Sequence, residues 1–481
     1  MKKKRAEKRE KFLLSYFERY SGEKIMTEKN GLRKLIEQFE RFDYYTEPKI
    51  ERDIEENRKG QFRFLFKNEK GELLDNVRIK LKQTRHAFKF GCTTFFLHQM
   101  ETPELNAEYE QKFTNIFNYG VIPLYWDTLE PEEGKPRFDK DSPFISRRPP
   151  LDEAVEFCER NGLDMKGHCL VYNSFQPSWL SDDNREIKIK IDKRLRELAQ
   201  RYGDKFVDVD VINEMLTIYK NCYPGNGCRN LQITDERDHE KWCFDICKRY
   251  FPHTRLFWNE GMQESFGDHY RGHRSYYHMA LREWLSKGAP IEGIGMQYHA
   301  FWPHWKGIEL FDEVKGALNP LRQLDVFDCY GEFGLPIHVS EVSIPSWTGE
   351  QFGEDEEAQA EIVKRLYKLW FSRKHCSSIV WWNFADDTAF SGENIFHAGL
   401  IHRDCTEKPA YRVLDELINH EWRTNFETNA DKELRFSGFY GTYEAEITHN
   451  GKTITQTIRL HEDNTGYDNR IRDFRAVNII I

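Results

Sequence analysis

Short apolar runs separated by helical stretches fill the middle of the chain. Eight of these runs have the length and the β-branched or aromatic content of buried strands. They cover Phe88–Cys92, Gly120–Leu124, Met165–Leu170, Phe206–Glu214, Thr254–Asn259, Ile294–His299, Ile337–Glu341 and Ser378–Trp382. Helix candidates between them include 151–161, 188–202, 238–250, 267–287, 355–373 and 408–420. This alternation predicts an α/β fold, a (β/α)8 TIM barrel over residues 86–425.

The alternative for such a pattern is a doubly wound sheet. That fold requires a glycine-rich phosphate turn after its first strand. The stretch Gly91-Cys92-Thr93-Thr94 is not such a turn, so the barrel is favoured.

Both flanks of the barrel have different patterns. Residues 1–58 are charged and helix-forming, with apolar residues at helical spacing from Leu32 to Phe39, which predicts a helix packed on the main body. Residues 59–85 alternate as a β-hairpin would, and 426–481 return to strand patterns around the turn Asn450-Gly451. We expect these hairpins to combine into a small β-sandwich beside the barrel, because isolated hairpins are marginally stable.

Composition narrows the classes of partner. The 481 residues suffice for a barrel and a smaller appendage. The net charge of −9, from 71 basic and 80 acidic residues, argues against nucleic acid. No stretch approaches the roughly 20 apolar residues of a membrane span. The basic start lacks the apolar core of a signal peptide, so we expect a cytoplasmic location, or secretion if a leader has been removed. The pattern indicates no oligomeric state.

The ten cysteines are scattered. Cys222 and Cys228 bracket a tight loop that a disulfide could bridge, and Cys243 and Cys247 lie one helical turn apart. Neither pair has the paired knuckles or accompanying histidines of a strong zinc pattern. We therefore expect reduced, buried thiols and predict no metal or cofactor.

The residues that follow the predicted strands form a set that fits one kind of chemistry. Glu214 by itself, after the strand that includes Asp210, would more often be a solvated strand end. A second carboxylate, Glu341, follows the seventh strand, and the carboxyl ends of barrel strands meet at one mouth. The same mouth would receive His168, Asn213, Asn259, Glu260, Gln297, His299 and Trp382.

Two glutamates and an aromatic platform suit the cleavage of glycosidic bonds. One carboxyl group must be protonated to donate to the leaving oxygen, and the other must be ionised. A histidine such as His299 beside Glu341 would favour the ionised form. A metal site of His168, His299 and Glu341 is the alternative, but it would leave Gln297 and Trp382 without a role.

Several stretches together resemble the successive motifs of glycoside hydrolase family 10, the endo-β-1,4-xylanase family, over about residues 85–425. They are Gly167–Tyr172, Asp210–Glu214, Gly293–His299 and Ile337–Val342. The resemblance implies a retaining mechanism, with Glu214 as acid/base and Glu341 as nucleophile. It implies that Asn213 bonds the sugar 2-hydroxyl. It also implies that His168, Gln297 and His299 line that sugar, with Trp382 beneath it and Tyr172 in the substrate site.

Some positions depart from the family pattern. Ile122 and Tyr125 stand where the family has asparagine and lysine, Tyr172-Asn173 where it has Trp-His, Phe175 where it has glutamine, and Ser343 where it has aspartate. Phe390 is the nearest candidate for the aromatic residue expected after strand eight. These changes replace hydrogen-bonding groups on one side of the cleft. We therefore expect the mechanism to be retained with an altered choice of sugar. Xylan or xylo-oligosaccharide is the default substrate, and another β-linked glycan or a catalytically silent carbohydrate-binding protein is the alternative.

Overall fold

The computed structural model describes residues 31–216, 237–267, 269–300, 316–347, 353–390, 392–468 and 473–481. Eight parallel strands close into a ring in the order β3-β4-β5-β7-β8-β9-β10-β11, and β11 pairs again with β3. Their bounds are β3 Lys89–Thr93, β4 Tyr119–Pro123, β5 Asp164–His168, β7 Phe206–Asn213, β8 Arg255–Glu260, β9 Gly293–His299, β10 Ile337–Ser343 and β11 Cys376–Trp381. All eight predicted strands are confirmed, and so is the TIM barrel.

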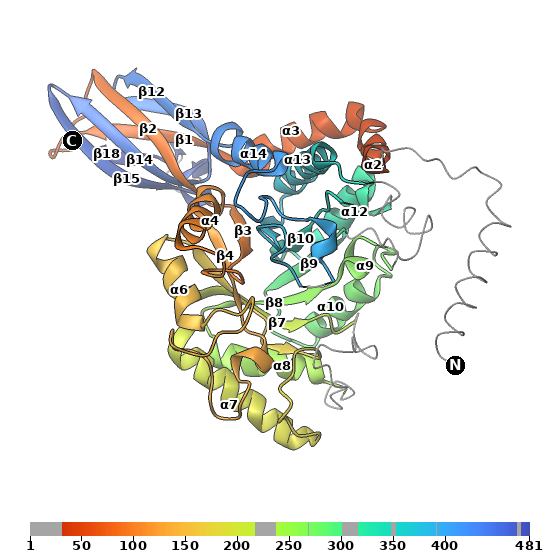
Figure 1. Cartoon of the computed structure of the whole chain (residues 1–481). Coiled ribbons are helices and arrows are strands. Elements are labelled where there is room, and N and C mark those ends of the chain that lie inside the picture. The colour runs from red at the N-terminus through yellow and green to blue at the C-terminus, as the bar shows by residue number, and fades with distance from the viewer. Residues whose placement is uncertain are drawn as a thin grey trace.

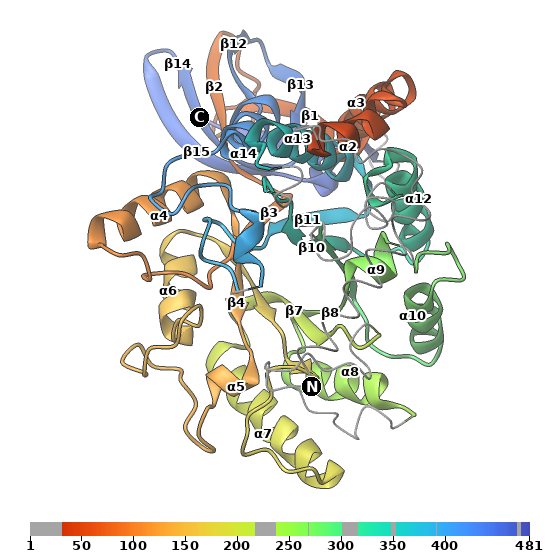
Figure 2. The same cartoon turned by 45° about the vertical axis from the view of Figure 1, so that its right-hand side comes forward.

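Helices surround this ring on its outside (Figures 1 and 2). They are α4 Pro103–Ile116, α5 Trp126–Leu129, α6 Leu151–Arg160, α7 Asn184–Tyr202, α8 His239–Tyr250, α9 Met262–Ser265, α10 Tyr276–Ser286, α12 Pro320–Gly331, α13 Glu356–Ser372 and α14 Pro409–Asp415, which a π-helical turn, Glu416–Glu421, continues. The helix expected over 267–287 begins only at Tyr276. The short α9 ends at Ser265, and a turn with Gly272 at φ +59° lies between it and α10. No helix among the described residues is long and apolar enough to cross a membrane.

Helix starts follow local capping chemistry. The Asp183 side chain accepts from two backbone N–H groups of the first turn of α7. Thr102 and Asn319 cap α4 and α12 in the same way, and each is followed by proline at the first helical position. These caps fix where each helix begins and therefore how it lies on the barrel.

The flanking strands form two stacked sheets at one end of the molecule (Figure 1). One has the order β13-β1-β18 and the other β12-β2-β14-β15. Their bounds are β1 Lys59–Lys67, β2 Val77–His86, β12 Asn425–Ala430, β13 Glu433–Phe439, β14 Gly441–His449, β15 Lys452–Leu460 and β18 Val477–Ile480. Two further pieces, β16 Tyr467–Asp468 and β17 Asp473–Phe474, pair with each other.

The predicted hairpin over 59–85 is wrong, although the sandwich is present. β1 and β2 lie in different sheets, with Phe62 opposite Phe436 and Ile79 opposite Ile447. Alternation gave each strand one buried face, and those faces meet across the sandwich core rather than side by side. The hairpin of β14 and β15 around Asn450-Gly451 is confirmed.

The segment before the barrel packs on α13. Helices α2 Gly31–Glu40 and α3 Asp43–Arg58 contact it, with Ile36 and Phe39 buried. Arg58 donates to the carbonyl oxygen of Cys376 at 2.7 Å, at the start of the last barrel strand. Residues 1–30 lie outside the described part of the chain.

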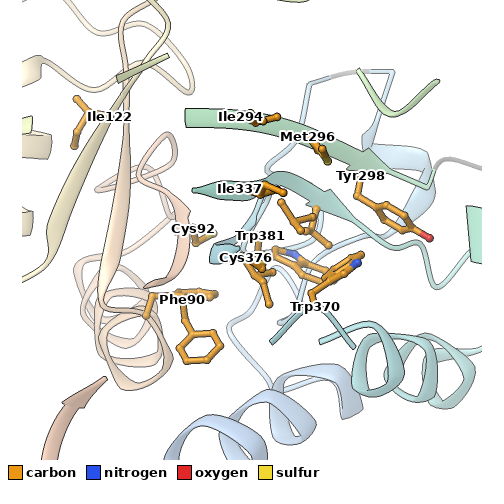
Figure 3. Packing of buried hydrophobic residues seen from close by; sticks show 14 of the residues in the cluster. Phe90, Cys92, Ile122, Ile294, Met296, Tyr298, Ile337, Trp370, Cys376 and Trp381 are labelled. Atoms are coloured by element: carbon orange, nitrogen blue, oxygen red, sulfur yellow. The ribbon is translucent and has the colours of Figure 1, made fainter. Parts of the chain in front are cut away.

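The main core fills the space between the barrel and its helices. Tyr298 on β9 meets Trp370 on α13 edge to face, with ring centroids 4.9 Å apart (Figure 3). Trp370 donates to Gln323 Oε1 at 2.8 Å, so its indole N–H is satisfied in an otherwise apolar layer. This packed layer holds the barrel strands in place, and the polar side chains at the barrel mouth project from the ends of those strands.

Candidate active site

The glutamate after the fourth barrel strand has a left-handed backbone. Glu214 has φ 52°, and its N–H donates to the carbonyl oxygen of Asn259 at 2.9 Å. A short strand, β6 Val171–Tyr172, pairs with β7 and places Tyr172 opposite Asn213. The sequence marked these residues separately, and the structure brings them together.

Two donors hold the carboxyl group of Glu214. The Tyr172 hydroxyl donates to Oε2 at 2.6 Å, and Gln297 Nε2 donates to Oε1 at 2.8 Å. Burial, together with the negative charge of Glu341, raises the pKa of Glu214, and the two hydrogen bonds only partly oppose this rise. The side chain is therefore biased toward its protonated form.

The second glutamate is deeply buried, with 3% of its surface exposed. Asn259 Nδ2 donates to Glu341 Oε1 at 2.7 Å, and His299 Nε2 lies 2.9 Å from Oε2. His168 Nε2 lies 3.8 Å from Oε1. Both carboxylate oxygens thus face a donor, and hydrogen bonds of this kind stabilise a charged carboxylate.

Asn259 links the two halves of the site. Its Nδ2 also donates to Asn213 Oδ1 at 2.7 Å, and its Oδ1 accepts from Ser340 Oγ. Sequence reasoning left the role of Asn259 open, and the structure shows that it orients both Asn213 and Glu341. Within the described residues the Asn213 NH2 group has no partner, so it is available to a ligand hydroxyl.

The neighbouring Glu260 holds the backbone that follows Glu214. It is fully buried and accepts from Trp258 Nε1 at 2.8 Å and from the Leu216 N–H at 3.1 Å. Burial raises its pKa to about 8. Glu260 is therefore neutral near pH 7, and its contact with Leu216 gives it a structural role.

Two buried charged residues hold the inner histidine in place. His168 Nδ1 lies 2.9 Å from Asp210 Oδ2, and Asp210 Oδ1 lies 2.7 Å from Lys166 Nζ. Because Asp210 holds the Nδ1 side, Nε2 faces the mouth, and it has no hydrogen-bond partner among the described residues.

The second histidine has a hydroxyl partner where the family pattern has a carboxylate. His299 Nδ1 lies 2.9 Å from Ser343 Oγ. Burial disfavours the charged imidazole, but the hydrogen bond and charge of Glu341 outweigh it and raise the pKa of His299. A serine hydroxyl can donate or accept, so this pair tolerates either protonation state of His299.

Aromatic rings close one side of the mouth. Trp382 is almost buried and meets the rings of His168 and His299 edge-on, at centroid distances of 5.2 and 5.8 Å. Tyr125 and Phe175 are two of the departures from the family pattern, and their ring centroids lie 4.8 Å apart. Their contact forms an aromatic wall beside His168.

The other departures have distinct positions. Ile122 is fully buried in the main core between the barrel and its helices. The ring centroid of Phe390 lies 6.4 Å from that of Phe175, and 41% of the Phe390 surface is exposed. Phe390 therefore extends the aromatic wall outward. Sequence reasoning missed Arg148, whose guanidinium lies 4.1 Å from the Tyr125 ring centroid. Its position in the long connection after β4, away from any strand end, gave no signal.

The cysteine predictions divide at the limits of the described residues. Cys243 and Cys247 are buried and free on α8, as expected of reduced thiols. Cys222 and Cys228 lie outside the described residues.

The structure thus combines a closed (β/α)8 barrel with a mouth that holds two carboxyl groups in different surroundings. The sequence model of glycosyl hydrolase family 10 matches residues 97–417. The chain belongs to this family.

Known proteins similar to this chain include regulators and enzymes. It is 25% identical over 411 residues to the anti-sigma-I factor RsgI6 of Acetivibrio thermocellus, covering 83% of this chain and 46% of that protein. It is 27% identical to endo-1,4-beta-xylanase 3 of Arabidopsis thaliana, covering 86% and 50%. The chain thus spans about half the length of these relatives. The fold matches xylanase 10B from Thermotoga petrophila RKU-1 in complex with xylobiose, with TM-score 0.53 at 19% identity over 70% of this chain and 95% of that one.

Proposed function

We propose that the chain is a retaining glycoside hydrolase that cleaves β-1,4-linked xylan or xylo-oligosaccharides with two glutamates. The observation that carries the proposal is the asymmetry of the pair. Glu341 is held by Asn259 and His299, whereas the pKa of Glu214 is raised by burial and by the charge of Glu341. One carboxylate suited to attack and one acid suited to donate are the two groups that double displacement needs.

In the first step Glu341 attacks the anomeric carbon while Glu214 protonates the leaving oxygen. The glycosyl ester that forms removes the charge of Glu341. Because that charge raises the pKa of Glu214, the pKa falls in the intermediate, and Glu214 becomes the base that activates water. The proton lost to the leaving group is then recovered from water, and Glu341 departs as a carboxylate.

The neighbouring residues would hold the sugar being cleaved. The unpartnered NH2 group of Asn213 and Nε2 of His168 are suited to hydroxyl groups. Trp382 would lie beneath the ring, where an aromatic face stacks on the C–H groups of a sugar. Gln297 acts on Glu214 as well as lining the site.

The choice of xylan rests on the relatives named endo-1,4-beta-xylanase. The aromatic wall of Tyr125 and Phe175 replaces hydroxyl-binding groups with ring faces. A ring face selects by shape rather than by hydrogen bonds, so we propose that the glycone preference differs from that of the family pattern.

A 2-fluoro glycoside tests the proposal, because it allows the ester to form but slows its hydrolysis. We expect the sugar mass on the peptide that contains Glu341, and a first product that retains its anomeric configuration by NMR. A parallel screen of defined β-linked oligosaccharides identifies the sugar and linkage. Inversion would refute double displacement, and sugar binding without hydrolysis of any glycan would favour the catalytically silent alternative.

Tyr172→Phe should shift the alkaline limb of kcat/KM to higher pH. The Tyr172 hydrogen bond lowers the pKa of Glu214, so its loss keeps the acid protonated to higher pH. The measurement is a pH profile on an unactivated oligosaccharide. Tyr202→Phe is the matched control, because that hydroxyl donates to Asp152 away from the barrel mouth. A shift of the Tyr172→Phe limb to lower pH would refute this role.

A further inference from the structure

We propose that His273, His278 and Cys329 bind a zinc ion on the outer wall of the barrel, away from its mouth. His273 lies in the turn before α10, His278 on α10 and Cys329 on α12. One potential ligand atom of each lies within 4.8 Å of the others. Figure 2 shows α10 and α12 side by side on this wall.

His278 is the strongest sign of a missing ligand. Only 2% of its surface is exposed, and neither ring nitrogen has a hydrogen-bond partner among the described residues. Its ring is enclosed by His273, Tyr330 and Phe333, with centroids 4.7–5.6 Å away. Buried polar atoms in native proteins are nearly always paired, and a metal bond to one nitrogen would pair it.

The types of ligand in this group favour zinc. Two imidazoles and a thiolate are ligands for zinc, whereas calcium and magnesium take oxygen ligands. The four-residue spacer between His273 and His278 is also within the range seen between paired zinc histidines. Cys243 and Cys247, by contrast, do not belong to such a group among the described residues.

Zinc binding requires only a small movement of the three ligand atoms toward one another. Tetrahedral zinc with bonds of about 2.0–2.3 Å separates its ligand atoms by roughly 3.3–3.8 Å, so the group must contract by about 1 Å. His273 can supply this movement because its side chain is 56% exposed and stands on a tight turn closed by Ser275 Oγ.

A carboxylate stands at the open side of the group. Glu332 Oε2 lies 2.9 Å from His273 Nε2. It is placed to orient His273 from outside the group. The bound ion would join the turn before α10, α10 itself and α12, in addition to the contacts of Tyr270 with Asp325 and of His273 with Glu332.

Zinc content and cobalt spectroscopy test this site on tag-free protein. We expect one bound zinc ion per chain by elemental analysis. Added zinc should raise the Tm of chelator-treated protein by roughly 5 °C, because a ligand that binds only the folded state stabilises it. Cobalt in place of zinc should produce a thiolate charge-transfer band in the near ultraviolet.

Cys329→Ser and His278→Phe should each abolish the zinc, the Tm response and the cobalt band. Cys243→Ser is the matched control, because Cys243 is also buried beside a histidine, with its Sγ 3.7 Å from His239 Nε2. Its variant should bind zinc like the wild type. Zinc content unchanged by Cys329→Ser, or a cobalt spectrum without a thiolate band, would overturn the proposal. Glycan hydrolysis should be the same in the Cys329→Ser and Cys243→Ser proteins, so the result is independent of the proposed function.

Discussion

Glu341→Gln is expected to lose activity on every glycoside by on the order of 10⁴-fold or more, because no covalent intermediate can form without the nucleophile. Glutamine keeps the size of the side chain and can still accept from Asn259, so the fold should be unchanged. The measurement is kcat on an aryl glycoside, whose good leaving group removes the need for an acid. Loss on this substrate therefore reports the nucleophile alone.

A matched control is Glu260, another buried glutamate of the barrel. Glu260 is buried, and its pKa of about 8 keeps it neutral near pH 7, so Glu260→Gln removes no charge and should keep activity within about tenfold. Azide should restore turnover to Glu341→Ala with an inverted glycosyl azide as product. Comparable losses in Glu341→Gln and Glu260→Gln would show that the effect is on packing rather than on chemistry.

The barrel could be predicted because its strands are buried on both faces. Runs such as Phe206–Asn213 are apolar over most of their length, and helical segments separate them, which leaves few arrangements. The strand pairing of the β-sandwich was harder to predict from the sequence. β1 pairs with β13, about 370 positions later in the chain, and alternation of buried residues specifies a face but not a partner.

Much of the candidate site followed from one geometric rule. The carboxyl ends of barrel strands meet at one mouth, so His168, Asn213, Gln297 and Glu341 could be grouped before any contact was known. The hydrogen bonds among these residues could not be predicted from the sequence. The contact of Tyr172 with Glu214 depends on β6, a two-residue strand with no pattern of its own.

Side chains outside the strand ends had no such rule. Arg148 reaches the aromatic wall from a connection whose path depends on the whole fold. The group of His273, His278 and Cys329 comes from two helices and a turn, and only tertiary packing makes it a cluster. Spacing within one segment can reveal zinc knuckles, but not ligands divided between separate helices.

Glu214→Ala should separate substrates by their leaving groups. Protonation by a general acid contributes about 10²–10⁴-fold when the leaving group is a sugar alcohol. The variant should therefore lose that factor on oligosaccharides and keep most of its first-step rate on activated aryl glycosides. The pKa of Glu214, raised by burial and by Glu341, is the physical basis of this expectation.

The second step gives a further signature of the same residue. Glu214 also activates water, so the variant should accumulate the ester on Glu341 with an activated substrate and show a burst of aglycone followed by slow turnover. Azide, which needs no base, should accelerate that turnover and give a glycosyl azide of retained configuration. Glu341→Ala should give the inverted azide instead, because azide then occupies the position of the nucleophile. Equal losses of Glu214→Ala on both kinds of substrate, with no burst, would contradict the acid/base role and leave Glu214 as a binding residue.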